Sequence, residues 1–397
     1  MPALLLFAVA VLVRILFNVS VTGMENGGLE LFPDGKDYDA LGWSLANGSG
    51  YELNHAPYTF RPPGYPVFLA AVYMLFGHSI AAVKILQSVL DAATCVMILL
   101  IGERLFARRV GVIAGAIAAV YPFLIVYTGF VLSEALFVFL STVFLYALLR
   151  FREHWSWRWL AVAGLLLGGM NLVRPAVLLL PAVLFFWLWI ELGAKRRAAV
   201  FAVVLALWML VPILPWTVRN YLVRSSVLLI ADHHWAALYA ANNRQILQNS
   251  DKIGGWIQPQ GGEDYRADYL SFIRDTALHE PLELVRLEVY KLYRFWSITP
   301  TSSHTTFRDT LVSFCSYGVL LLFAVGGMVL SLKMAQTPWL LFFWIANFCL
   351  MTLILYGSTR LRSPVEPALI LFGALALERV WLTWAGRAGR PGVPKGA

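Results

Sequence analysis

The sequence predicts an all-α membrane protein, a polytopic bundle of about ten transmembrane helices with interfacial helices in its first outer loop. Composition is the first reason: 59% of the 397 residues are apolar and 14% are charged, and the mean hydropathy is +0.68. Ordinary soluble domains are roughly 45–50% apolar and about 25% charged. A soluble protein of this composition could not cover its surface with polar groups. A soluble globule, a disordered chain and a fibrous repeat are therefore excluded.

The second reason is the spacing of the apolar runs, which have the length that crosses a bilayer, about 20 residues. They fall near residues 3–19, 80–101, 110–128, 132–149, 158–172, 176–190, 198–216, 309–330, 338–356 and 364–383. The short pair at 158–172 and 176–190 is split at Arg174-Pro175, which favours tilted or partly re-entrant helices. The proline-rich run 62–76 is too short to span, and we expect it to lie in the interface.

The first run is expected to be a retained span and not a signal peptide. It carries Arg14 inside its apolar stretch and lacks both a basic start and a small-residue cleavage site. The three cysteines form neither a disulfide framework nor a CxxC metal motif. The net charge of +8 is no nucleic-acid signal, because the basic residues are scattered over loop ends.

Lys and Arg in the short loops predict the orientation, because they concentrate on the cytoplasmic side. One set of loops carries fourteen of them: Arg104, Arg108, Arg109, Arg150, Arg152, Arg158, Lys195, Arg196, Arg197, Lys333, Arg379, Arg387, Arg390 and Lys395. The opposite short loops carry five: Lys36, Arg61, Arg174, Arg360 and Arg362. Both termini are therefore expected in the cytoplasm, with two long segments outside, at about 20–79 and 217–308.

Cations at the outer boundary suggest an anionic ligand such as a phosphate. The residues concerned are Arg61, Lys84, Arg174, Arg219, Arg360 and Arg362. Arginine suits phosphate because its planar fork donates two parallel hydrogen bonds. The alternative is that each cation reaches separately towards lipid headgroups.

Two acids lie at expected helix starts on the same side. Asp34 follows Pro33 in a turn-like Pro-Asp-Gly sequence, and Glu134 follows Ser133 at the start of the fourth span. The structural interpretation is a turn or capping aspartate, and a glutamate that the helix dipole favours. The functional interpretation of Asp34 is a general base that takes a proton from an attacking hydroxyl. An acid at the end of an apolar span such as Glu134 is also a functional hypothesis in its own right.

These motifs together resemble a known group. Asp34-x-x-x-Tyr38, Arg61-Pro-Pro-Gly-Tyr-Pro66, Ser133-Glu134, Asn171-Leu-Val-Arg174-Pro175 and Pro215-Trp216-Thr-Val-Arg219-Asn-Tyr221 occur in this order, followed by Arg360-Leu-Arg362-Ser-Pro364-Val-Glu-Pro367. The set is similar to that of bacterial membrane glycosyltransferases of the GT-C type, in the glycosyltransferase family 39-like group of protein mannosyltransferases and lipid A aminoarabinose transferase. The likeness covers residues 1–221 and 357–370; the segment 222–308 matches nothing in that group.

The resemblance implies a glycosyltransferase that moves a sugar from a polyprenyl-phosphate donor to a lipid, glycan or protein acceptor at the outer face of the cell inner membrane. Asp34 then corresponds to the catalytic acid, with Glu134 as the second acidic residue of the site. The donor phosphate would be held by Arg61, Lys84, Arg219, Arg360 and Arg362, with Asp37, Tyr38 and Arg174 as further candidates. Inversion at the anomeric carbon is expected if a carboxylate activates the acceptor opposite the leaving phosphate.

A cofactor is not required by the sequence, although a divalent metal stays open. Gly35 stands where several relatives carry a second acid, so the metal site is in question, and Asp232-His233-His234 is a poor zinc motif because adjacent histidines cannot easily face one ion. The alternatives are a lipid-linked glycan polymerase or ligase with a diphosphate-linked donor, and a secondary transporter. No internal repeat supports the transporter.

We expect three regions along the chain. Residues 1–221 form the glycosyltransferase core with its catalytic outer loop at 20–79, residues 222–308 form a second outer segment, and residues 309–397 contain the last membrane helices and a cytoplasmic tail. Within 222–308, Gly254-Gly255 and Gly261-Gly262 indicate joints, and two helices are expected after them. The interpretation is a lid or an acceptor platform; the alternative is a packed loop domain without substrate contact.

Overall fold

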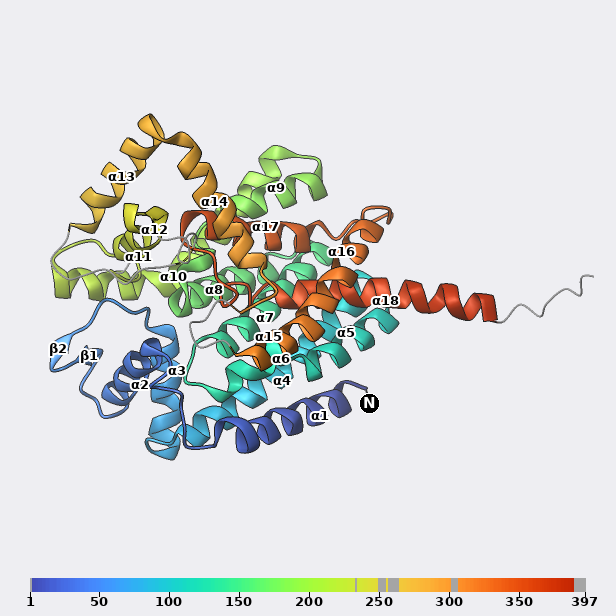
Figure 1. Ribbon diagram of the computed structural model, residues 1–397, viewed down its shortest axis with the longest axis horizontal. Helices are drawn as coiled ribbons and strands as arrows, with labels where there is room; N and C mark the ends of the chain where they lie inside the picture. Colours follow the sequence, from blue (N-terminus) through green and yellow to red (C-terminus); the bar gives the residue numbers. More distant parts are fainter. Residues whose placement is uncertain (1, 233, 249–254, 256–263, 301–305, 389–397) are drawn as a thin grey trace, which may run out of the picture.

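The computed structural model describes residues 2–232, 234–248, 255, 264–300 and 306–388, and within them the chain is almost entirely helical (Figure 1). The glycine joints at 254 and 261–262, and His233 of the zinc motif, lie outside the described residues. The predicted all-α class is confirmed. The two short strands pair antiparallel as a hairpin, Glu52 opposite Pro57.

Helices and strands follow one another with these bounds. The first half contains α1 (Pro2–Phe17), η1 (Asn18–Thr22), α2 (Pro33–Ala46), β1 (Glu52–Leu53), β2 (Ala56–Pro57), α3 (Gly64–Phe76), α4 (Ile80–Leu105), α5 (Arg108–Val120), α6 (Pro122–Ile125), η2 (Val126–Gly129), α7 (Glu134–His154), α8 (Trp157–Val173) and η3 (Pro175–Val177). The second half contains α9 (Leu180–Leu192), α10 (Lys195–Arg224), α11 (His234–Ala241), α12 (Arg244–Gln248), α13 (Tyr265–His279), α14 (Pro281–Trp296), α15 (Phe307–Ser313), η4 (Phe314–Gly318), α16 (Val319–Ser331), α17 (Trp339–Ile354) and α18 (Glu366–Ala388).

Each of the ten predicted spans is helical, but in the described residues only seven helices are long and apolar enough to cross a membrane by themselves. The run 110–128 is a pair of helices bent by 56°. The bend falls at Tyr121-Pro122, where proline lacks the N–H that would continue α5. Runs 158–172 and 338–356 form helices of 17 and 16 residues, about 25 Å long at 1.5 Å per residue. Seven or eight is therefore the number of spans by length, and the chain is a multi-pass helical protein.

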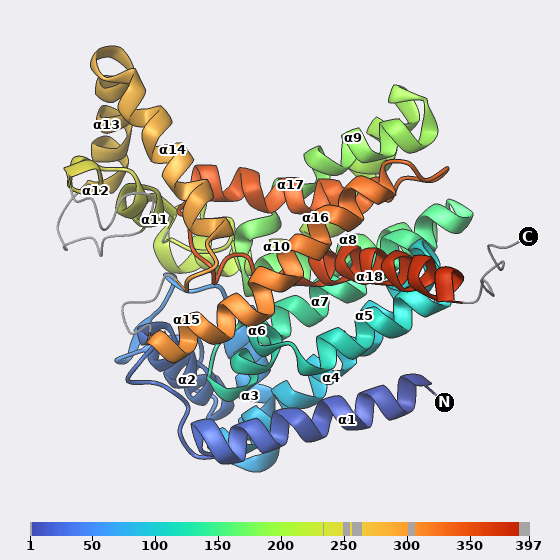
Figure 2. The same ribbon diagram turned by 45° about the vertical axis from the view of Figure 1, so that its right-hand side comes forward.

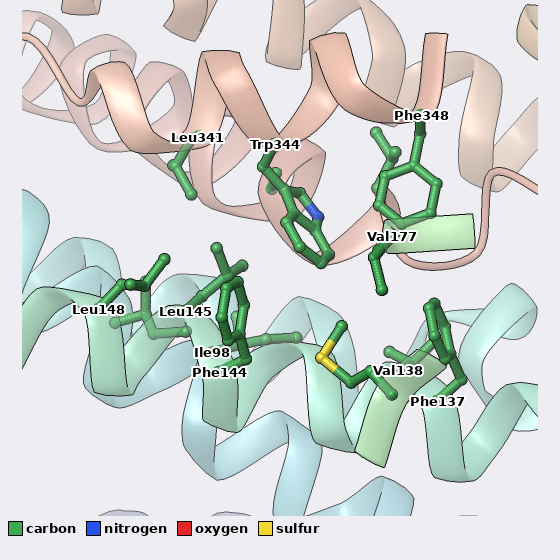
Figure 3. Close-up of a cluster of buried hydrophobic side chains, with 14 of the residues drawn as sticks. Ile98, Phe137, Val138, Phe144, Leu145, Leu148, Val177, Leu341, Trp344 and Phe348 are labelled. Atoms are coloured by element: carbon green, nitrogen blue, oxygen red, sulfur yellow. The ribbon is translucent and has the colours of Figure 1, made fainter. Parts of the chain in front are cut away.

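The interior is apolar and closely packed. Trp344 and Phe348 of α17 face Phe144 and Phe137 of α7 across the core (Figure 3), with ring centroids 6.0 and 6.5 Å apart. Helices α4 and α5 touch at two glycines: a Cβ on Gly102 would lie 2.7 Å from the Cα of Gly111. Small residues permit such contact between membrane helices.

The first helix is tied into this bundle by a buried ion pair. Arg14 donates to Asp91 of α4 at 2.5 Å and to the carbonyl of Ala119 at 2.9 Å. Both side chains are essentially inaccessible. An intramembrane charge is costly unless paired, so Arg14 fixes α1 against α4 and α5.

Two groups of elements lie at the end of the bundle opposite the chain termini (Figures 1 and 2). One contains α2, the hairpin and α3, where α3 is the short helix expected at 62–76. The other contains α11 to α14, the helices of the segment 222–308. These elements frame the candidate site.

Candidate active site

Asp34 lies in the first turn of α2, one residue after Pro33. Proline at this position starts a helix without losing a hydrogen bond, and the helix dipole favours the carboxylate. The start of α2 is held against the segment before α7: the rings of Phe32 and Phe130 pack edge to face at 5.2 Å, and the N–H of Val131 donates to Gly27. This packing brings Asp34 near Glu134, although 100 residues separate them.

Glu134 is fully buried at the start of α7. Its Oε1 accepts from Arg174 at 2.9 Å and from the Nε of Arg360. Oε2 is buried and has no hydrogen-bond partner among the described residues. Ser133 makes no capping bond with its side chain. The simple capping explanation of Ser133-Glu134 therefore does not account for this pair.

Arg360 joins the two acids. Its Nη1 donates to Asp34 at 3.0 Å while its Nε donates to Glu134. The residue belongs to the turn that connects α17 to α18, so the last part of the chain completes a site whose other members come from the first half. A guanidinium has five N–H donors in a fixed fork, more than these two contacts use.

Arg61 approaches Asp34 from the other side. Its Nη2 lies 2.9 Å from Asp34 and its Nε 2.9 Å from Asp37. The guanidinium also lies over the ring of Tyr38 at 5.8 Å. The hydroxyl of Tyr51 donates to the carbonyl of Arg61 at 3.0 Å, which fixes the backbone of the loop.

The resulting cluster contains three arginines and three carboxylates from five elements, namely Arg61, Arg174, Arg360, Asp34, Asp37 and Glu134. Burial raises the pKa of Asp34, but Arg360, Arg61 and Arg174 outweigh it and hold that pKa below its usual value. Burial disfavours the charge of Arg360, yet Glu134 and Asp34 raise its pKa well above the ordinary value. Asp34 and Arg360 are therefore both ionised at neutral pH.

Tyrosines border the network. Tyr38 is buried on α2, and burial together with the charge of Asp34 raises its pKa. Tyr58 donates to Asp37 at 3.4 Å, and burial and Asp37 raise its pKa to about 12. Both phenols keep their protons at neutral pH. Tyr58 and Phe32 were not among the predicted site residues; the only signal in the sequence was their position next to Arg61 and Asp34.

Three predicted phosphate ligands lie outside this network. Lys84 donates to the hydroxyl of Thr22 and the carbonyl of Gly23. Arg219 donates to the carbonyls of Tyr58 and Tyr51 at 2.7 and 2.9 Å. Each of these cations satisfies local backbone and hydroxyl oxygens instead of facing the acids.

Arg362 is the third of them and is fully buried. It donates to Glu366 at 2.7 Å and to the carbonyls of Phe295 and Ser297, and Tyr121 donates to the same carboxylate at 2.7 Å. The Arg362–Glu366 pair has the i,i+4 spacing of helical ion pairs, a signal that the sequence did contain.

A divalent ion does not fit this arrangement of carboxylates. Among the residues that the structure describes, no group of three His, Cys, Asp or Glu side chains could hold a metal. Asp34 and Glu134 are already bridged by a cationic side chain, Arg360. We therefore derive no step through a metal.

The fold is that of a polytopic helical membrane protein. Residues 60–216 match the family model of the dolichyl-phosphate-mannose-protein mannosyltransferases. No curated protein matches the sequence. The resemblance drawn from the sequence motifs is confirmed at this level.

Two solved structures of one archaeal enzyme share the fold. The archaeal oligosaccharyltransferase AglB from Archaeoglobus fulgidus, in complex with an inhibitory peptide and a dolichol-phosphate, superposes with a TM-score of 0.62 at 17% identity, over 100% of this chain and 52% of that one. Its complex with Zn and sulfate gives 0.60 at 17% identity, over 98% and 50%. ArnT from Cupriavidus metallidurans, bound to undecaprenyl phosphate, gives 0.48 at 16% identity, over 97% and 79%. The chain thus spans about half the length of the oligosaccharyltransferase.

Proposed function

We propose that this chain is a glycosyltransferase that moves a sugar from a polyprenyl-phosphate donor to an acceptor at the outer face of the inner membrane. The observation that carries the proposal is the bridge Asp34–Arg360–Glu134, with Arg61 and Arg174 closing it on either side. The fold likeness to an oligosaccharyltransferase whose structure contains a dolichol-phosphate supports the same class. Sugar, polyprenol length and acceptor are left open by the proposal.

The arginines would stabilise the leaving phosphate. A polyprenyl phosphate leaves poorly while its charge is uncompensated, and preorganised cations at the developing charge are usually the largest catalytic term. Arg61 and Arg360 are partly exposed beside Asp34, so their remaining N–H donors can reach an anionic ligand. Arg174 would keep Glu134 charged and Arg360 in place.

Asp34 would act as the base. Its carboxylate is ionised, partly exposed and held by two arginines. Taking the proton from an acceptor hydroxyl opposite the leaving phosphate gives direct displacement and inversion. Glu134 is buried behind Arg360, which suits a positioning role better than contact with the acceptor.

The three regions expected along the chain share one site. Residues 1–221 would contain the core, but Arg360 of the region 309–397 completes the network. The segment 222–308 would close over it as a lid or acceptor platform. The N–H of Asp232 donates to Thr59 at 2.9 Å, which places the beginning of that segment beside the loop of Arg61.

A transfer assay on the purified protein tests the proposal. Radiolabelled polyprenyl-monophosphate sugars are offered one by one with a membrane extract as acceptor, with and without chelator. We expect label transfer from one donor and a loss of about 10²–10⁴-fold in Asp34→Asn, the range of a general base. Asp39→Asn is the matched control: Asp39 lies on the same helix but accepts from Tyr73 and contacts His78.

Each other outcome has a defined meaning. Transfer retained in Asp34→Asn would remove the base assignment. Transfer from diphosphate-linked donors alone would favour the lipid-linked polymerase or ligase. Lipid movement across vesicles without label transfer would favour the transporter.

A further inference from the structure

Helix α14 presents apolar side chains on a face that its own segment leaves uncovered. Leu282, Val285, Val289 and Tyr293 are 59–80% exposed and recur every three or four residues. Helices at a water-facing surface normally carry polar residues on the open face. The α13–α14 corner continues this surface with Leu278, 71% exposed.

The opposite face of α14 is packed. Leu287 is buried with Ile246 of α12 and Phe272 of α13. In both views α13 lies on the side of α14 away from the membrane helices (Figures 1 and 2). The open face of α14 is therefore turned towards the side on which the bilayer lies.

Contacts near the end of α14 fix its level in the membrane. Lys291 donates to the carbonyl of Leu353 at 2.8 Å, one residue before the end of α17. Tyr317 donates to the carbonyl of Trp296 at 3.4 Å, and Ser313 donates to Ile298, both from the span Phe307–Ser331. The end of α14 thus lies beside the end of α17 and beside residues within the span Phe307–Ser331, while its other end projects beyond α17 (Figure 2).

We propose that the open face of α14 is a membrane-docking surface that lies in the outer leaflet of a phospholipid bilayer. Leu282, Val285 and Val289 enter the boundary between headgroups and acyl chains, as in other interfacial amphipathic helices. Tyr293 lies at the level of the headgroups, where tyrosine is enriched. Continuity with the adjacent span favours lipid over a protein partner, because the same outer end is already at the membrane.

Arg286 fits this occupant. It lies on the open face, 3.2 Å from Glu283, and can exchange that exposed partner for a lipid phosphate. The docked helix would hold the segment 222–308 against the loop of Arg360, since Arg362 donates to the carbonyls of Phe295, in its last turn, and of Ser297, just beyond it. The proposal does not depend on the transferase activity.

Fluorescence quenching on the full chain tests this surface. In a background with Cys315→Ser and Cys349→Ala, V289C carries an environment-sensitive label, and R274C on the exposed face of α13 carries the control label. Both proteins are placed in nanodiscs of phosphatidylethanolamine and phosphatidylglycerol. We expect the label at 289 to emit at shorter wavelength, to be quenched by doxyl-labelled lipids, and to be several-fold less accessible to aqueous iodide than the label at 274.

Two results would overturn the proposal. Equal iodide quenching at both positions would show that the face is open to water. Protection from iodide without lipid quenching would show that a second copy or another protein covers it. A second variant makes the test independent of the label at 289. V285E combined with V289E should reduce lipid quenching of a label at L282C. Unchanged elution from gel filtration shows that this variant is still folded.

Discussion

Asp34 is held in its charged form by arginines that lie 27 to 326 residues away in the sequence. Burial alone would raise its pKa; Arg360, Arg61 and Arg174 reverse the sign. A carboxylate with a lowered pKa is a weaker base, but it is completely ionised at neutral pH. The arginines therefore make Asp34 a weaker base but fix its charge and its orientation.

The pH dependence of transfer follows from this sign. The carboxylate form of Asp34 is present above its lowered pKa and is lost as the pH falls through that pKa. We therefore expect kcat/KM to stay constant as the pH is lowered from neutral, and to fall only near the lowered pKa. Arg61→Ala removes one of the charges that lower the pKa of Asp34. We expect the acid limb of its kcat/KM profile to move to higher pH. If the acid limb of the profile stayed in place or moved to lower pH, either Asp34 would not be the base or Arg61 would not lower its pKa.

At the scale of elements, Arg219 of α10 holds the hairpin that leads to Arg61. It donates to the carbonyls of Tyr51 and Tyr58, and its guanidinium lies 4.9 Å from the ring of Trp216. We expect Arg219→Ala to increase the rate of proteolytic cleavage within residues 47–60 and to lower transfer through a misplaced Arg61. Arg197→Ala, exposed near the beginning of the same helix, is the control.

Donor binding distinguishes this clamp from the phosphate ligand expected from the sequence. If Arg219 contacts the donor, its variant will lose donor affinity without any change in cleavage of the hairpin. If it is a clamp, both change together. Limited proteolysis and donor titration on the same preparation decide between them.

The turn between α17 and α18 depends on the buried pair Arg362–Glu366. Both side chains are almost inaccessible, and breaking a buried pair from one side costs about 3–5 kcal/mol. We expect Arg362→Ala to lower the melting temperature markedly in detergent. Replacing both partners, R362M with E366L, should recover part of the loss because no uncompensated charge remains. A double variant no more stable than Arg362→Ala would show that the carbonyl contacts to Phe295 and Ser297 matter more.

The sequence predicts the helices better than the contacts that individual side chains make. Apolar length predicts the helices, and Arg174-Pro175 predicts a break that the structure has between α8 and η3. The bend at Tyr121-Pro122 was missed because one proline stands in an otherwise continuous apolar run. The cations at the outer boundary were recognised together, but Arg61, Arg174 and Arg360 differ from Lys84, Arg219 and Arg362 only in what they contact. Backbone carbonyls are the acceptors of Arg219, and no residue pattern marks them.

At the scale of the whole molecule, the arginine-rich short loops and the acid–arginine network lie at opposite ends. Arg14 and Asp91 pin the first helix against the side of the bundle, and the start of α1 points to the same side as the end of α18 (Figure 2). Arginine-rich junctions such as α4–α5 lie at that end, whereas α2 and the hairpin lie at the other (Figure 1). Positive charge in short loops marks the cytoplasmic side, so the acid–arginine network should face outward.

Cysteine labelling in intact cells tests this orientation, which the proposed donor and acceptor require. Lys36 is half exposed on α2, beside the network, and Lys333 is exposed between α16 and α17. In a Cys315→Ser background, we expect K36C to react with a membrane-impermeant maleimide in intact cells and K333C to react only after the membrane is opened. Both sites should react equally in detergent, which serves as the control for intrinsic reactivity. The reverse pattern would place Asp34 in the cytoplasm, where it could not meet an acceptor at the outer face, and the transferase proposal would fail with it.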